Sequence, residues 1–172
     1  MKVKIEIVKG KVCDFVADAY VLPFFPTHVS PDKERNDVEH AGARGVRKFV
    51  DFRLLHQKDG NPLKLGEVYV MDAMGGKSRY LLNVVCRNSD IEVMKDAIRF
   101  GILGILMVAE KYGIRHIVMP PMCVSDGLSV EDFATVFQNV VKEYAQPIFI
   151  EKITIATKYE ERFKALSNYE FN

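Results

Sequence analysis

The sequence predicts an α/β protein: a three-layer α/β/α sandwich with a mixed, largely parallel central sheet. Two observations lead to this class. Segments with the apolar pattern of strands alternate with segments of helical periodicity, which is typical of parallel strands covered by helices on both faces. One pair of strands, at 67–72 and 79–87, is separated only by Met74-Gly75-Gly76-Lys77, which indicates a hairpin and makes the sheet mixed.

The first third of the chain contributes two strands and one helix. Residues 3–8 alternate charged and apolar side chains, as a half-buried strand does, and 17–24 form a second apolar run. Residues 27–37 turn polar and include a charge cluster from Asp32 to Arg35, which predicts a long exposed loop where mobility or function is expected. Apolar residues then recur at helical spacing, so a helix is expected at 38–56.

A long helix is expected at 91–111, after an N-cap in Asn88-Ser89-Asp90 and before Gly113. Gly101 and Gly104 inside it each weaken a helix by about 1 kcal/mol relative to Ala, which indicates close packing of the helix on the sheet.

The remaining pattern completes the sandwich. A short strand at 115–119 ends in two prolines, and Ser129 caps the next helix. A last strand at 148–156 and a helix at 160–166 follow. With no linker or repeat, residues 1–172 are predicted to form one domain.

Composition narrows the function classes. The 24 Lys and Arg nearly cancel the 23 Asp and Glu, so a nucleic-acid partner is not expected. The three cysteines have no framework spacing and predict reduced thiols and a cytoplasmic location. The N-terminus alternates unlike a signal peptide, and the apolar stretch 98–109 is too short to span a bilayer, so no membrane is expected. The four histidines lack ligand spacing, and neither a metal nor a cofactor is predicted.

Several short motifs resemble the macrodomain family. They are Gly10-Lys11-Val12-Cys13 followed by Ala17-Asp18-Ala19-Tyr20-Val21, then Leu65-Gly66-Glu67-Val68, Arg79-Tyr80-Leu81-Leu82-Asn83-Val84-Val85 and Ile114-Arg115-His116-Ile117-Val118-Met119-Pro120. Each resembles a family strand or turn, and they occur in the family's order. The resemblance implies a cleft at the carboxyl ends of the strands, where ADP-ribose or a related nucleotide would bind.

The resemblance also assigns residues to the cleft. Lys11 stands where the family has an Asp that accepts a hydrogen bond from adenine. An ammonium group only donates, so Lys11 would instead attract a phosphate or carboxylate; an exposed surface lysine is the alternative. Leu22 and Phe25 stand at the family's two Asn positions and have no polar side-chain atom, so no catalytic residue carries over. Tyr159 is near the position of an aromatic residue that stacks on adenine in the family.

Two phosphate loops follow from the same resemblance. The first maps onto Arg44, Gly45 and Val46, with 27–37 as an insertion; a plain helix is the alternative. The second maps onto the run Cys123, Val124, Ser125, Asp126 and Gly127. Asp126 would repel a pyrophosphate unless a cation or an arginine offsets it, and the alternative is a turn that caps the next helix.

Three hypotheses remain open. The chain binds ADP-ribose or a related anion without catalysis; or it is an assembly module, such as a homo-oligomer, whose cleft is plugged by Leu22, Phe24 and Phe25; or it is a hydrolase with altered chemistry. The hydrolase would use Cys123, Ser125 and Asp126 with a base from 27–37, and a Cys123 pKa well below the ordinary value would support it.

Overall fold

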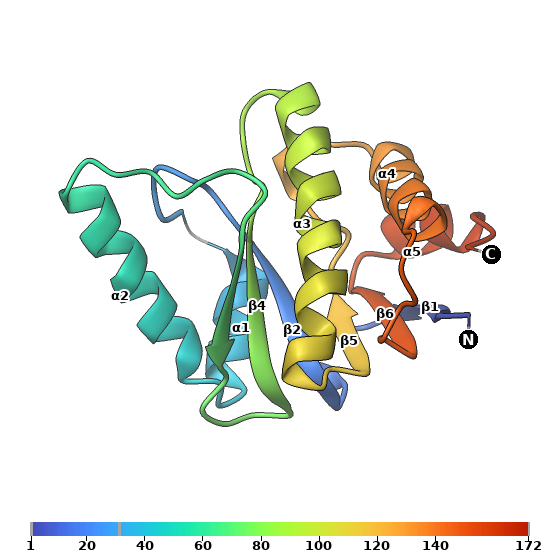
Figure 1. The fold of residues 1–172 in the computed structure, drawn as a ribbon, viewed down its shortest axis with the longest axis horizontal. Helices are drawn as coiled ribbons and strands as arrows, with labels where there is room; N and C mark the ends of the chain where they lie inside the picture. The colour runs from blue at the N-terminus through green and yellow to red at the C-terminus, as the bar shows by residue number, and fades with distance from the viewer. Residues whose placement is uncertain (1, 31, 172) are drawn as a thin grey trace.

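The computed structural model describes residues 2–30 and 32–171, which contain a six-stranded sheet of order β1-β6-β5-β2-β4-β3 (Figure 1). Its strands are β1 Lys4–Lys9, β2 Ala17–Phe24, β3 Val68–Asp72, β4 Ser78–Val85, β5 His116–Met119 and β6 Lys152–Thr157. Neighbouring strands from β1 to β4 are parallel, and β3 pairs with β4 in the antiparallel direction. The predicted mixed, largely parallel sheet and its hairpin are confirmed.

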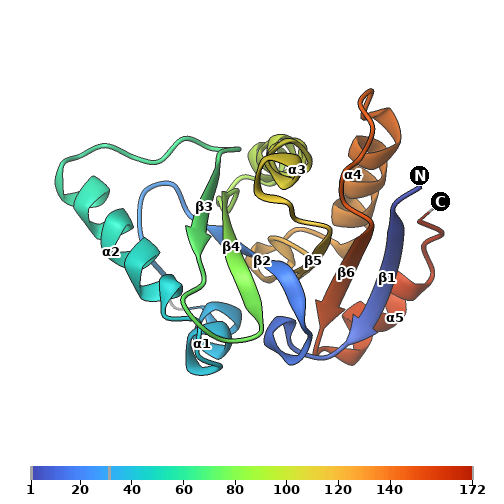
Figure 2. The ribbon, with the colours of Figure 1, turned by 60° about the horizontal axis from the view of Figure 1, so that its bottom comes forward.

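Helices cover both faces of the sheet (Figure 2). They are α1 Lys33–His40, α2 Gly45–Lys58, α3 Ile91–Tyr112, α4 Val130–Glu143 and α5 Glu160–Ser167, with short 3-10 turns η1 Val12–Asp14 and η2 Val124–Asp126. Along β2, Ala19 and Val21 belong to the core under α3 and α4, whereas Tyr20 and Leu22 belong to the core under α1 and α2. This is the predicted α/β/α sandwich, and α5 packs beside α4 and β1.

The predicted helix ends are confirmed where a polar cap or a glycine specifies them. The Asp90 carboxylate accepts a hydrogen bond from the Val93 amide at 3.1 Å and starts α3, and Gly113 ends it with a φ of 67°. Ser129 caps α4 by accepting from the Asp132 amide at 3.0 Å. In the described part of the chain, no helix is both long and apolar enough to cross a membrane.

The region 27–56 differs from its prediction. The predicted exposed loop 27–37 becomes helical at its end, because α1 starts at Lys33, and the predicted helix 38–56 is split into α1 and α2. The split comes at Gly42, whose φ of 108° lies outside the helical region. Pro31, which falls in the predicted loop, lies outside the described residues.

Candidate functional site

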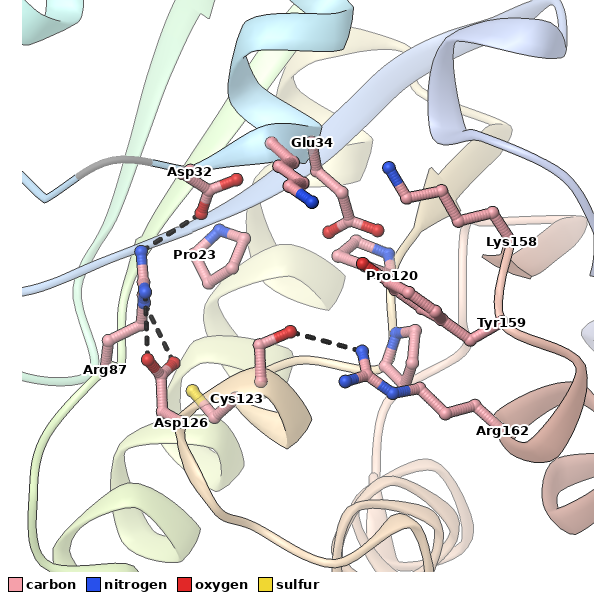
Figure 3. Close-up of a pocket in the computed structure, with 13 residues that line it drawn as sticks. Pro23, Asp32, Glu34, Arg87, Pro120, Cys123, Asp126, Lys158, Tyr159 and Arg162 are labelled. Atoms are coloured by element: carbon pink, nitrogen blue, oxygen red, sulfur yellow. Dashed lines mark hydrogen bonds and ion pairs between the residues drawn. The ribbon is translucent and has the colours of Figure 1, made fainter.

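A cavity of about 310 Å³ lies at the carboxyl ends of β2, β4, β5 and β6 (Figure 3). Pro23, Pro120 and Pro121 line it from the ends of β2 and β5. The first residues of α1, the loop after β5 and the segment that joins β6 to α5 line the rest. Open α/β sheets bind ligands at this edge, and the volume is at the lower end of the range for small-molecule sites.

Arg87 forms a buried ion-pair cluster at one side of the cavity. Its guanidinium donates two hydrogen bonds of 2.8 Å to the Asp126 carboxylate and one of 3.0 Å to Asp32. It also lies over the Phe25 ring, 4.4 Å from the centroid. Burial opposes the charge of Arg87, but the bonds to Asp126 and the charge of Asp32 raise its pKa. Arg87 therefore offsets one of the two negative charges that would otherwise repel an anion, and the cluster keeps a net charge of about −1.

Asp32 connects this cluster to the start of α1. One of its carboxylate oxygens bonds Arg87, and the other accepts from the Arg35 amide at 3.0 Å as the helix N-cap. The guanidinium of Arg35 lies 5.2 Å from the centroid of the Phe24 ring, and Val38 packs into the core. These contacts hold a helix with little apolar surface against the cavity.

Cationic and aromatic groups line the opposite side. The Arg162 guanidinium donates to the Ser125 hydroxyl at 3.1 Å and lies 4.4 Å from the centroid of the Tyr159 ring, which is 42% exposed. In residues 2–30 and 32–171, Arg162 has no ion pair with a carboxylate. The Lys158 ammonium lies 3.5 Å from Asp37, which also pairs with Lys11 at 3.5 Å. This side therefore has cationic charge that carboxylates do not fully offset.

Glu34 lies between these two sides. Figure 3 shows its carboxyl pointing from α1 into the cavity, toward Pro120 and Tyr159. Burial, with the charge of Asp32, raises the pKa of Glu34 from 4.5 to about 7, although Lys158 and Arg162 act in the opposite direction. The described part of the chain gives this carboxyl no hydrogen bond and no ion pair.

Cys123 lines the cavity but has the environment of an inert thiol. Its Sγ lies 3.4 Å from the Sγ of Cys86, and both side chains are buried. The hydrogen bond to Cys86 and burial raise the pKa of Cys123. The low pKa that would support a cysteine-based hydrolase is therefore not present.

Four of the residues that the sequence assigned to the cleft line this cavity: Cys123, Ser125, Asp126 and Tyr159. Val124 and Gly127 flank them in the same loop, and Leu22 lies in the core beneath α1 and α2. Phe25 lies under Arg87, stacked on His28. Lys11 pairs with Asp37, which in turn pairs with Lys158 in the cavity wall.

Arg44, Gly45 and Val46 lie away from this cavity. Arg44 donates to the carbonyl of Met74 in the β3–β4 turn at 3.2 Å, and Val46 is buried in the core. A Cβ on Gly45 would lie 2.1 Å from the carbonyl oxygen of Asp72, so glycine is needed there for close backbone packing. The helix that begins at the cavity is α1, and its first residues are charged.

Sequence reasoning named the segment 27–37 as a source of function but none of its residues, and it did not assign Arg87, Lys158 or Arg162. The structure shows that six such residues line the cavity: Asp32, Lys33, Glu34, Arg87, Lys158 and Arg162. A signal existed for two of them. Arg87 and Lys158 follow closely after buried strands whose carboxyl ends meet at one edge. No group of three or more His, Cys, Asp or Glu in the described residues is placed to hold a metal ion.

The layers and the strand order define an α/β/α protein, and it has a ligand-sized cavity at the carboxyl edge of its sheet. Its fold is that of the macrodomains. The Oceanobacillus iheyensis macrodomain with ADP matches 95% of this chain and 87% of its own at a TM-score of 0.79 and 14% identity. The Trypanosoma brucei macrodomain in complex with ADP-ribose matches 94% of this chain and 67% of its own at 0.71 and 18%. No protein-family model and no curated protein matches the sequence, so its similarity is one of structure.

Proposed function

We propose that this protein binds ADP-ribose or a related nucleotide in the cavity and does not hydrolyse ADP-ribosyl bonds. The observation that carries the proposal is the pair Arg162 and Tyr159, a guanidinium without a carboxylate partner that is stacked on an exposed ring. A guanidinium and an aromatic ring are the groups that hold a phosphate and a base. Macrodomains that share the fold are known in complex with ADP-ribose and ADP.

The charges of the cavity support an anionic ligand. Arg87 pairs with both Asp126 and Asp32, which lowers the electrostatic repulsion that a pyrophosphate would meet at the loop after β5. Arg162, Lys158 and the Ser125 hydroxyl remain as donors on the opposite side. We place the pyrophosphate on these donors, with the base on Tyr159 at the rim.

The lack of turnover is proposed from Leu22 and Phe25. These side chains have no atom that orients a water or a ribose hydroxyl. Cys123, with its raised pKa, does not supply a nucleophile instead. An ADP-ribosylated protein incubated with this chain should therefore keep its modification, and its release at a rate above the buffer control would contradict this part of the proposal.

Calorimetric titration with ADP-ribose tests binding. We expect saturable binding that becomes at least about tenfold weaker in Arg162→Ala, because a charge-assisted hydrogen bond contributes roughly 1.5–3 kcal/mol. Arg44→Ala is the matched control, since it removes the same side chain at a position away from the cavity.

Three results would count against this proposal. Equal weakening by Arg162→Ala and Arg44→Ala would indicate a general charge effect. Weakening by Arg44→Ala alone would move the ligand to the start of α2. Absence of heat at millimolar ADP-ribose and millimolar ADP would reject nucleotide binding and favour an interaction module.

A further inference from the structure

We propose that the cavity takes up one proton when it binds its anionic ligand, and that the Glu34 carboxyl holds that proton. This inference rests on the proposed function, because it concerns the same ligand in the same cavity. The new element is that the affinity for the ligand depends on pH.

The position of Glu34 is the first argument. Its carboxyl points into the cavity toward Tyr159, and Lys158 and Arg162, the cations that an anion would meet, line the same cavity (Figure 3). A carboxylate at that place repels a phosphate, and the repulsion is strong where water is excluded. A protonated carboxyl instead presents an O–H donor that can bond a phosphate oxygen. The same side chain therefore opposes or supports binding according to one proton.

The second argument is that the other carboxyls nearby are already committed. Asp32 and Asp126 are bonded to Arg87, and Asp37 is shared between Lys11 and Lys158. Glu34 has no such partner in the part of the chain that the structure describes. It is the carboxyl of the cavity that can lose its charge without breaking an ion pair.

The charged and titratable groups around Glu34 determine how readily it is protonated. They come from α1 and its N-cap, the end of β4, the loop after β5 and the segment after β6, and they are Asp32, Lys33, Asp37, Arg87, Cys123, Asp126, Lys158, Tyr159 and Arg162. Burial and the acidic neighbours Asp32 and Asp37 prevail over Lys158 and Arg162, so the pKa of Glu34 rises to about 7. A bound anion adds negative charge and would raise it further.

Titration with ADP-ribose at several pH values tests the inference. ADP-ribose is the probe because its pyrophosphate is a diester and lacks the second phosphate ionisation near pH 6 that a phosphate monoester has, so its charge is constant between about pH 6 and pH 8. A site that needs protonated Glu34 should bind about tenfold more weakly at pH 8 than at pH 6, by linkage. At pH 7 the measured binding enthalpy should differ between Tris and bis-Tris buffers, because the buffer supplies the proton and the two buffers have different ionisation enthalpies. Neither buffer is an anion that would compete for the site.

Glu34→Gln is the decisive variant, because the amide keeps the shape and a donor but cannot ionise. It should bind with an affinity independent of pH and with no proton uptake. Glu39→Gln, on the same helix but paired with Arg47, should keep the wild-type pH dependence. If Glu34→Gln does not fold, the ¹³C shift of the Glu34 carboxyl followed against pH should show an upward shift of its pKa on adding ADP-ribose.

The outcomes separate this inference from the proposed function. Binding that is independent of pH would overturn the inference and leave nucleotide binding intact. A pH dependence that persists in Glu34→Gln would assign the proton to another group and would also overturn it. No binding at either pH would reject both.

Discussion

Arg87 joins the start of α1 to the loop after β5 through three hydrogen bonds to two carboxylates. Only about a tenth of each of the three side chains is exposed to solvent. Ion pairs at this depth lose much of their hydration, so their contribution to the stability of the fold depends on every partner being present. Arg87 is thus a positioning residue for both walls of the cavity.

Arg87→Ala is expected to lower the free energy of unfolding by about 3–5 kcal/mol, because it leaves two largely buried carboxylates without a partner. Urea unfolding monitored by circular dichroism measures this change. Arg47→Ala, which removes an exposed arginine paired with Glu39, should cost no more than about 1 kcal/mol. If Arg87→Ala were as mild as Arg47→Ala, the cluster would not hold the walls together.

Site residues were predictable only where the resemblance supplied their position. The loop after β5 gave Ser125 and Asp126, and the segment after β6 gave Tyr159, all of which line the cavity. Glu34 could not be singled out within 27–37, because its neighbours in the cavity come from segments that are distant in sequence. Arg87 had a signal in its place just after β4, but charge alone does not distinguish it from a solvated residue.

At the scale of elements, β-strand and helix patterns predicted every strand and the three C-terminal helices, while α1 was missed. The reason is its composition: in Lys33–His40, only Val38 is apolar, so no helical periodicity exists to detect. The helix is stabilised by its Asp32 cap and by the packing of Arg35 on Phe24. The cap is a local contact, but the contact between Arg35 and Phe24 is tertiary and leaves no trace in a local pattern.

The close packing of α3 on the sheet was predicted from two glycines, and the structure confirms it. A Cβ on Gly101 would lie 2.5 Å from Cγ1 of Val84, and one on Gly104 would lie 2.8 Å from Cγ2 of Val68. Real side chains do not approach so closely. These glycines set the distance between the helix and β3 and β4.

Gly101→Ala should therefore destabilise the protein, although alanine favours a helix by about 1 kcal/mol. Overpacking costs roughly 1–3 kcal/mol, and the stiff side chain of Val84 cannot yield easily. We expect a net loss of up to about 2 kcal/mol in urea unfolding. The double variant Gly101→Ala, Val84→Ala should show a favourable coupling between the two sites. A stabilised single variant would mean that α3 can move away from the sheet at little cost.

For the whole molecule, the sequence predicted the sandwich, but the residues it assigned to a first phosphate loop, Arg44, Gly45 and Val46, lie away from the cavity. A glycine before a helix suggested Gly45, yet Gly45 packs against the backbone of Asp72. The helix start that reaches the cavity is α1, and it carries Asp32, Lys33 and Glu34. A local motif could not reveal this, because the spatial order of α1 and α2 depends on how the chain packs on the sheet.

Hydrogen exchange can distinguish the two locations. A ligand in the cavity contacts three segments from different elements, so it should slow amide exchange at 32–36, 123–127 and 158–162 together. With ADP-ribose at roughly 100 times its Kd, binding adds about 2.7 kcal/mol to the free energy of any opening that releases the ligand. Amide exchange through such an opening should slow by up to about 100-fold. Amides at 43–47 should exchange as in the free protein, because Arg44 and Gly45 lie elsewhere. Protection confined to 43–47 would place the anion at the start of α2, and the proposed site at the strand ends would then be wrong.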